Sequence, residues 1–141
     1  MGSRPAYDWF RTQSRFDITR HPHEPNRFGW VVEVDPYSPG SIPVKRTALG
    51  RFSHEAATTA LNPDGRVVVY SGDDNPMEYI YRFVSRGRFD PSRPVSRLGL
   101  LDDGVLSVAR FDQSGLDWLD LELGNGPLTP GHGFHSQADV L

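Results

Sequence analysis

The sequence predicts an all-β fold, an antiparallel meander of short strands. Short apolar-rich stretches that alternate with polar positions are separated by turn residues, which is the pattern of such a fold. The 12 prolines and 14 glycines among 141 residues interrupt the chain too often for long helices. An aromatic residue recurs in most expected strands, which suits sheets packed face to face, as in propeller blades. We therefore expect part of a β-propeller-like architecture.

Six strands are expected along the chain, and each ends at a turn rich in Pro, Gly, Asp or Ser. They cover residues 28–34, 44–49, 66–70, 78–84, 105–111 and 117–123. The third is a continuous apolar run, which predicts burial on both faces. We expect the third strand to pair with the fourth, and the fifth with the sixth. The one helix signal covers residues 53–61, with Ser53 as its N-cap.

The length predicts one domain with one modest core. We expect residues 1–141 to form a single partial propeller segment, with an irregular lead-in over residues 1–26. Residues 124–141 are expected to be a C-terminal loop. Its last four residues, ADVL, have the pattern of a strand that stops without a turn, which indicates truncation.

The composition excludes several classes of function. The net charge is −3 and the basic residues are scattered, so no surface for nucleic acid or an anionic membrane is expected. Cysteine is absent, which excludes disulfides, a thiolate zinc site and a cysteine nucleophile. The first ten residues, MGSRPAYDWF, lack the apolar core of a signal peptide, so nothing in the chain itself predicts export.

Two acidic groups could bind a cation. Asp73, Asp74 and Glu78 offer the hard oxygen ligands that calcium prefers. Alternatively, the aspartates accept backbone N–H bonds in a tight turn. The spacing matches no EF-hand loop, so the residues alone favour the turn. For the stretch 102–104 (Asp-Asp-Gly), a hairpin turn is likewise favoured over a metal-binding role.

The neighbours His54 and Glu55 could bind a metal or act as an acid–base pair, although one His beside one Glu is common by chance. The remaining histidines, at positions 21, 23, 132 and 135, lie in segments rich in Pro or Gly and give weak signals. No nucleophile elbow, phosphate-binding loop or His-Glu-x-x-His helix is present.

Long runs of the sequence carry a family resemblance. The runs RFGWVVEVDPYSPGSIPVKRTALGRFSHEAA and VVVYSGDDNPMEYIYRFVS closely resemble the PhoX-type alkaline phosphatases. RFDITRHPHEPNRFGWVVEVDP and GPLTPGHGFHSQADVL extend the resemblance in the same order over most of the chain. Runs of this length are more specific than any single motif above.

The resemblance implies a β-propeller enzyme that hydrolyses phosphate monoesters with calcium and iron, whose charges neutralise the phosphoryl oxygens. The family's Gly-Arg-Phe-x-His-Glu stretch ends on Glu55, so the resemblance implies that Glu55 is a metal ligand. Asp73, Asp74 and Glu78 match a Gly-Asp-Asp…Glu-Tyr-Ile-Tyr pattern, which implies that they bind metal or hold the loop. Glu33 is expected to support the fold.

The chain also departs from the family pattern. The family has a cysteine-bearing segment and a Glu before this region, and an Asp-Arg-Pro-Glu stretch with an Arg and a Glu of the site after it. This chain has no cysteine and reaches Leu141 before that stretch, and the family's His-Glu-Gly ends here in Ala56. We therefore expect a central segment of a PhoX-type phosphatase that is inactive alone.

An alternative is a non-catalytic module that binds calcium or self-associates through uncovered strand edges. The expected partners are a phosphomonoester in the complete enzyme, no nucleic acid and no membrane. The resemblance implies export to the periplasm or the outside of the cell, as is typical of the family.

Overall fold

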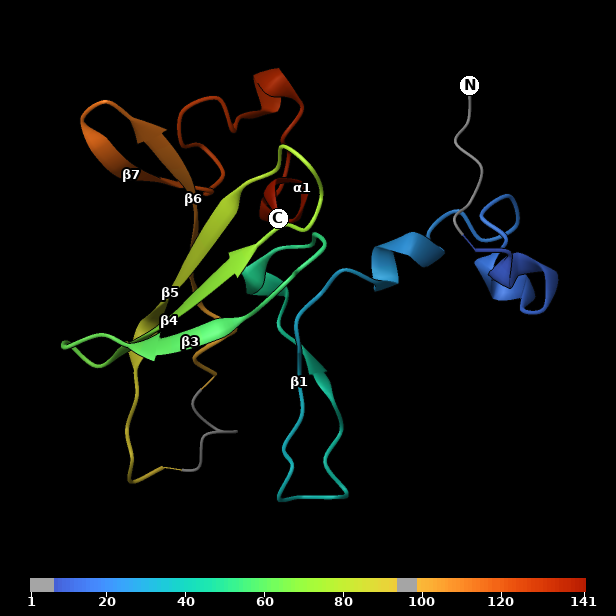
Figure 1. Ribbon diagram of the computed structural model, residues 1–141, viewed down its shortest axis with the longest axis horizontal. Helices are drawn as coiled ribbons and strands as arrows, with labels where there is room; N and C mark the ends of the chain where they lie inside the picture. The colour runs from blue at the N-terminus through green and yellow to red at the C-terminus, as the bar shows by residue number, and fades with distance from the viewer. Residues whose placement is uncertain (1–6, 94–98) are drawn as a thin grey trace.

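The structure, a computed structural model, describes residues 7–93 and 99–141. Its main element is a five-stranded antiparallel sheet in the order β3-β4-β5-β6-β7 (Figure 1). The strands are β3 (Thr58–Leu61), β4 (Arg66–Gly72), β5 (Ile80–Arg88), β6 (Gly104–Asp112) and β7 (Gly115–Asp120). From β4 onward each strand pairs with the one before it in the sequence, which is the predicted meander.

The two predicted pairings are confirmed. β4 pairs with β5, with Val69 opposite Phe83. β6 pairs with β7, with Ala109 opposite Trp118. The predicted burial of β4 on both faces is confirmed at its centre. Val68 and Val69 point to opposite faces of the sheet, and each is only 2% exposed.

The first two predicted strands are shorter than expected. Only β1 (Val32–Glu33) and β2 (Val44–Lys45) form, as a separate two-stranded sheet. Gly29 has a φ of +81°, which breaks the extended chain before β1. After β2 the chain turns into the 3₁₀ helix η4 (Thr47–Leu49) instead of continuing as a strand.

Two further expectations are wrong. The helix expected over residues 53–61 does not form, and its second half is β3. The turn over residues 62–65 brings the β-branched Thr58 and Thr59 directly opposite Tyr70 and Val69 of β4. Strand pairing there satisfies the backbone better than an isolated short helix would.

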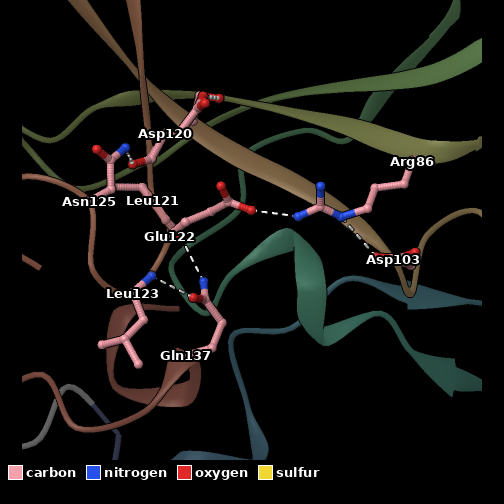
Figure 2. A network of polar contacts seen from close by, with 9 residues as sticks. Arg86, Asp103, Asp120, Leu121, Glu122, Leu123, Asn125 and Gln137 are labelled. Carbon is pink, nitrogen blue, oxygen red and sulfur yellow. Dashed lines mark hydrogen bonds and ion pairs between the residues drawn. The ribbon is translucent and has the colours of Figure 1, made fainter.

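The strand expected at the C-terminus is the short helix α1 (Gln137–Val140). Ser136 and Asp139 form a capping box at its start, which satisfies free N–H groups of the first turn. Gln137 then connects α1 to the segment after β7, since its side chain forms hydrogen bonds with the backbone of Leu121 and Leu123 (Figure 2).

One face of the five-stranded sheet carries the hydrophobic core, and we name it the core face. Val69, Phe83 and Leu106 of three neighbouring strands pack there with Leu49 of η4. Leu141, next to α1, packs against the same cluster. At Gly104 an added Cβ would lie 2.3 Å from the ring of Phe83, so only glycine fits beside that ring.

A polar link joins the small sheet to the loop before β6. Arg46 is 8% exposed and its guanidinium lies 2.7 Å from both Glu33 and Asp102. This contact agrees with the expected supporting role of Glu33. Asp102 lies in the expected turn before β6, where its N–H donates to the carbonyl of Gly99 over 3.0 Å. The connection is longer than that turn, since β5 ends at Arg88 and β6 begins at Gly104.

The N-terminal part lies apart from the main sheet (Figure 1). It contains the 3₁₀ helices η1 (Trp9–Arg11), η2 (Ser14–Phe16) and η3 (Glu24–Arg27). Rings of Tyr7, Trp9, Phe16 and Phe28 contact one another in sequence. Near the other end of the chain, η6 (Pro130–His132) precedes α1. Within the described residues, no helix has the length and apolar character needed to span a membrane.

Candidate functional site

Two backbone segments meet at the end of β4 and bring three of the predicted site residues together. The N–H of Glu55 donates to the carbonyl of Gly72 over 3.1 Å, and the N–H of Asp74 donates to the carbonyl of Ser53 over 2.9 Å. His54 and Asp73 form an antiparallel bridge between these bonds. Residues 53–55 and 72–74 therefore act as a short strand pair that carries Glu55, Asp73 and Asp74.

Asp73 is used by the protein itself. Its Oδ1 accepts hydrogen bonds from the backbone N–H and the side-chain amide of Asn75, at 3.0 and 2.7 Å. Its own N–H donates to the carbonyl of Tyr79 over 3.1 Å, which closes the turn that carries Glu78. This is the turn geometry that the residues alone favoured, with a carboxylate that bonds the backbone two residues on.

Glu55, Asp74 and Glu78 are exposed. Within the described residues, none of these three carboxylates has an ion-pair partner or a hydrogen-bond donor. Gly72 leaves room beside Glu55, since an added Cβ would lie 3.8 Å from the Oε2 of Glu55. Glu55 and Asp74 thus present free oxygens near one end of β4, and Glu78 lies on the far side of the turn.

These side chains do not amount to a complete metal site. In the part of the chain that the structure describes, no group of three or more His, Asp or Glu residues lies close enough to hold a metal ion. His54 does not add a ligand, because both of its ring nitrogens face protein groups. Nδ1 lies 2.8 Å from the hydroxyl of Ser71, and Nε2 lies 3.1 Å from the carbonyl of Gly50.

His54 instead anchors the segment that carries Glu55. Its ring packs on Phe52 at 3.7 Å between centroids, and Phe52 packs on Tyr81 of β5 at 4.2 Å. Ser71 continues the chain of contacts, since its hydroxyl donates to the carbonyl of Ala56. The sequence did not predict this role of His54, and the aromatic residues at positions 52 and 81 are the signal that points to it.

The environment favours the neutral forms of His54 and Tyr81. Burial lowers the pKa of His54, and the contacts with the Gly50 carbonyl and the charge of Asp73 oppose that shift only in part. A carbonyl oxygen only accepts, so Nε2 donates to Gly50, and the bare Nδ1 of neutral His54 then competes with the Ala56 carbonyl for the one hydroxyl proton of Ser71. Burial also raises the pKa of Tyr81, with the charges of Asp73 and Glu78 acting in the same direction.

The other histidines lie away from this site. His21 and His23 are exposed in the N-terminal part. The Nδ1 of His132 lies 3.1 Å from the hydroxyl of Thr129, and the backbone N–H of His135 donates to Asp139. Both of these contacts are local, and they support the turns around η6 and α1.

Comparisons with known proteins relate the whole chain to one family. The family described as "Alkaline phosphatase PhoX" matches residues 1–141. A solved structure, Pseudomonas fluorescens PhoX in complex with vanadate, a transition state analogue, matches with 46% identity and a TM-score of 0.89. The match covers 95% of this chain and 25% of the P. fluorescens chain, so this chain spans about a quarter of that relative. No curated protein matches.

Proposed function

The chain belongs to the PhoX family of alkaline phosphatases, as the sequence predicted, and from this premise we propose that it supplies part of a metal-dependent phosphatase site. The reaction is the hydrolysis of phosphate monoesters with calcium and iron. Glu55 is a metal ligand, and Asp73, Asp74 and Glu78 bind metal or hold its loop. The complete site needs parts of the family fold outside residues 1–141, so this chain alone is inactive.

The observation that carries the proposal is the meeting of residues 53–55 with residues 72–74. It places Glu55 and Asp74 diagonally on one short, hydrogen-bonded strand pair, with Glu55 opposite Gly72 and Asp74 opposite Ser53. Carboxylates placed together without a cationic side chain repel one another, so a cation between them is favourable. This arrangement supports a cation site more strongly than the sequence alone did.

The ligand atoms that these residues offer are of the type that the proposed metals bind. Glu55, Asp74 and Glu78 offer only hard oxygen ligands, which calcium prefers and ferric iron accepts. Bound metals would supply positive charge that stabilises the phosphoryl oxygens. The chain's own residues provide the support: His54 fixes the backbone before Glu55, and Asp73 holds the turn that ends at Tyr79.

The architecture of the complete enzyme is part of the same proposal. A twisted meander of antiparallel strands, each adjacent to the one before it, is the building unit of a propeller blade. We place the five-stranded sheet in such a blade, with residues 53–55 and the turn after β4 at the end that faces the metals.

Calcium titration by calorimetry tests the ligand assignment. We expect weak binding, with Kd on the order of 10⁻⁴ to 10⁻³ M, because the site holds few ligands. Glu55→Gln should weaken it about tenfold or more, since even indirect support of a metal is worth that much. The pair Asp73→Asn and Asp74→Asn tests the second segment.

Glu122→Gln is the matched control for that titration. The substitution removes the same charge, but Glu122 lies in the segment after β7, where it pairs with Arg86. Equal calcium affinity in the natural chain, Glu55→Gln and the aspartate pair would refute the ligand assignment.

The second candidate function is a non-catalytic module that binds calcium or self-associates. It is favoured by the outer strands β3 and β7, whose outer edges have no neighbouring strand in the described residues. Exposed apolar side chains lie on both, namely Leu61, Leu116 and Leu119. Two results would favour this module over the phosphatase, provided that no turnover is seen even in a complete family fold. One is stabilisation of the chain by calcium, and the other is an increase in particle mass measured by light scattering.

A further inference from the structure

The face of the main sheet opposite the core carries an unusual row of side chains. Strand register places one residue from each strand in this row: Thr58, Tyr70, Arg82, Ser107 and Asp120. Residues in register on neighbouring strands point to the same side of the sheet. We name this side the Arg82 face.

Arg82 is at the centre of the row and lacks a polar partner. Its Cζ lies over the Trp118 ring, 4.5 Å from the ring centre, so the guanidinium makes a cation–π contact with the indole. Its Nε is buried and meets no acceptor. Across residues 7–93 and 99–141, Arg82 forms no ion pair and no hydrogen bond with its side chain.

The neighbouring arginines differ from Arg82 in this respect. A hollow of about 260 Å³ lies over the same face, and Arg66, Arg82 and Arg86 all contribute to its lining. Arg66 pairs with Asp64 at 2.7 Å, and Arg86 pairs with Asp103 and Glu122. Of these three arginines, Arg82 alone forms no ion pair with a carboxylate among the described residues.

The side chains around Arg82 form a prepared rim. Ser107 is 1% exposed and donates its hydroxyl to Asp120 over 2.7 Å. The rings of Tyr70 and Trp118 lie 6.0 Å apart, and Tyr70 remains 42% exposed. Val84 and Val105 add apolar lining to the hollow. Tryptophan, tyrosine and arginine are the residues most enriched at the energetic hot spots of protein interfaces, and all three meet here.

We propose that the Arg82 face docks a segment of the PhoX fold that lies outside residues 1–141, and that this segment places a carboxylate on Arg82. A buried N–H without an acceptor is unfavourable, so the face is incomplete without one. Arginine is the residue whose planar fork best matches a carboxylate in a buried setting. This inference rests on the part of the proposed function that assigns the chain to a larger enzyme.

A polypeptide carboxylate suits the face better than a free anion. Asp120 lines the same hollow and repels any anion, and it repels multiply charged phosphate more strongly than the single charge of a carboxylate. The apolar rim gains from contact with side chains, which a small anion cannot offer. The chain spans 25% of the P. fluorescens PhoX chain, so most of such a fold lies outside the matched segment and is available to pack here.

The test compares the same substitution in two settings. In the first setting, residues 1–141 are produced alone. In the second, they replace the matched segment of P. fluorescens PhoX, and we call the resulting protein the chimera. Arg82→Gln should lower the Tm of the chimera by about 3 °C or more and change the Tm of the isolated chain by roughly 1 °C or less. Arg82→Lys, which keeps the charge but loses the fork, should not restore the chimera.

Arg110→Gln is the control. Arg110 pairs with Asp117 at 2.6 Å on an exposed part of the neighbouring strands, and the chimera keeps both residues. Its loss should change neither Tm by more than about 1 °C. If the chimera does not fold, light scattering of the isolated chain mixed with the remaining part of P. fluorescens PhoX gives a second readout, in which Arg82→Gln should abolish the complex.

Three outcomes would overturn the proposal. Arg82→Gln with equally small effects in both settings would mean that no carboxylate meets Arg82. Stabilisation of the isolated chain by inorganic phosphate that depends on Arg82 would mean a small-anion site. An Arg82-dependent dimer of the isolated chain would mean that a second copy covers the face.

Phosphatase activity of the chimera is measured separately. An inactive chimera whose Tm depends on Arg82 would support the docking face and refute the proposed function. An active chimera whose Tm is independent of Arg82 would support the proposed function and refute the docking face.

Discussion

The two faces of the main sheet differ in how they are completed. On the core face, Phe83 and its neighbours are covered by η4 and by Leu141 beside α1, all from this chain. On the Arg82 face, Trp118 and Tyr70 form a partial cover around a guanidinium with a buried Nε that meets no acceptor. The core face is therefore completed by residues of this chain, whereas the Arg82 face leaves a buried N–H donor without an acceptor.

The largest expected effect is on the core face. Phe83 is 1% exposed and fills the centre of the cluster, so Phe83→Ala should lower the free energy of unfolding by about 3–5 kcal/mol. Urea unfolding followed by circular dichroism measures it. Phe111→Ala is the control, because Phe111 is 66% exposed on β6. A loss of similar size in the two variants would contradict the location of the core.

A smaller effect is expected on the Arg82 face of the isolated chain. Trp118→Ala removes the ring under Arg82 and part of the cover over the sheet, at a cost of about 1 kcal/mol. The same urea experiment measures it, with Trp9→Ala as control, since Trp9 lies in the N-terminal part. If Trp118→Ala costs as much as Phe83→Ala, the two faces are equally complete and the comparison fails.

The smallest effect concerns pH at the edge of the core face. Hydrogen bonds from the backbone N–H of His135 and from Ser136 lower the pKa of Asp139. A carboxyl group with a lowered pKa stabilises the folded state above its unfolded pKa, about 4, and this contribution is lost as pH falls through the folded value. The α1 segment should therefore loosen below pH 4.

Amide hydrogen exchange at Leu141, whose N–H donates to Gln137, reports that loosening. Exchange should become easier between pH 4 and pH 2, after correction for the intrinsic rate. In Asp139→Asn the protection should be lower throughout and independent of pH over this range. A natural chain whose protection is constant down to pH 2 would show that the capping box does not hold α1.

Local sequence patterns predicted the centre of the fold. The alternating runs at 78–84 and 105–111 and the turns beside them were enough to predict both hairpin pairings, because register there follows from turn position and from one buried face. The family assignment was equally accessible, since it rests on long ordered runs.

Long-range contacts account for what the sequence did not predict. β3 was mistaken for a helix, because Thr58 and Thr59 choose a strand only when β4 lies opposite. The anchoring of His54 depends on Ser71 and Gly50, which no spacing rule connects to it. The missing partner of Arg82 is likewise visible only after three strands are in register.

The central claim is that this chain carries a ligand of a PhoX phosphatase site but not the complete site. Turnover of p-nitrophenyl phosphate with calcium and ferric iron tests it, in the isolated chain and in the chimera with P. fluorescens PhoX. We predict no turnover above buffer for the isolated chain, and turnover by the chimera that falls by roughly a hundredfold or more in Glu55→Gln. Turnover by the isolated chain that disappears in Glu55→Gln would contradict the claim, since residues 1–141 would then assemble a working site by themselves.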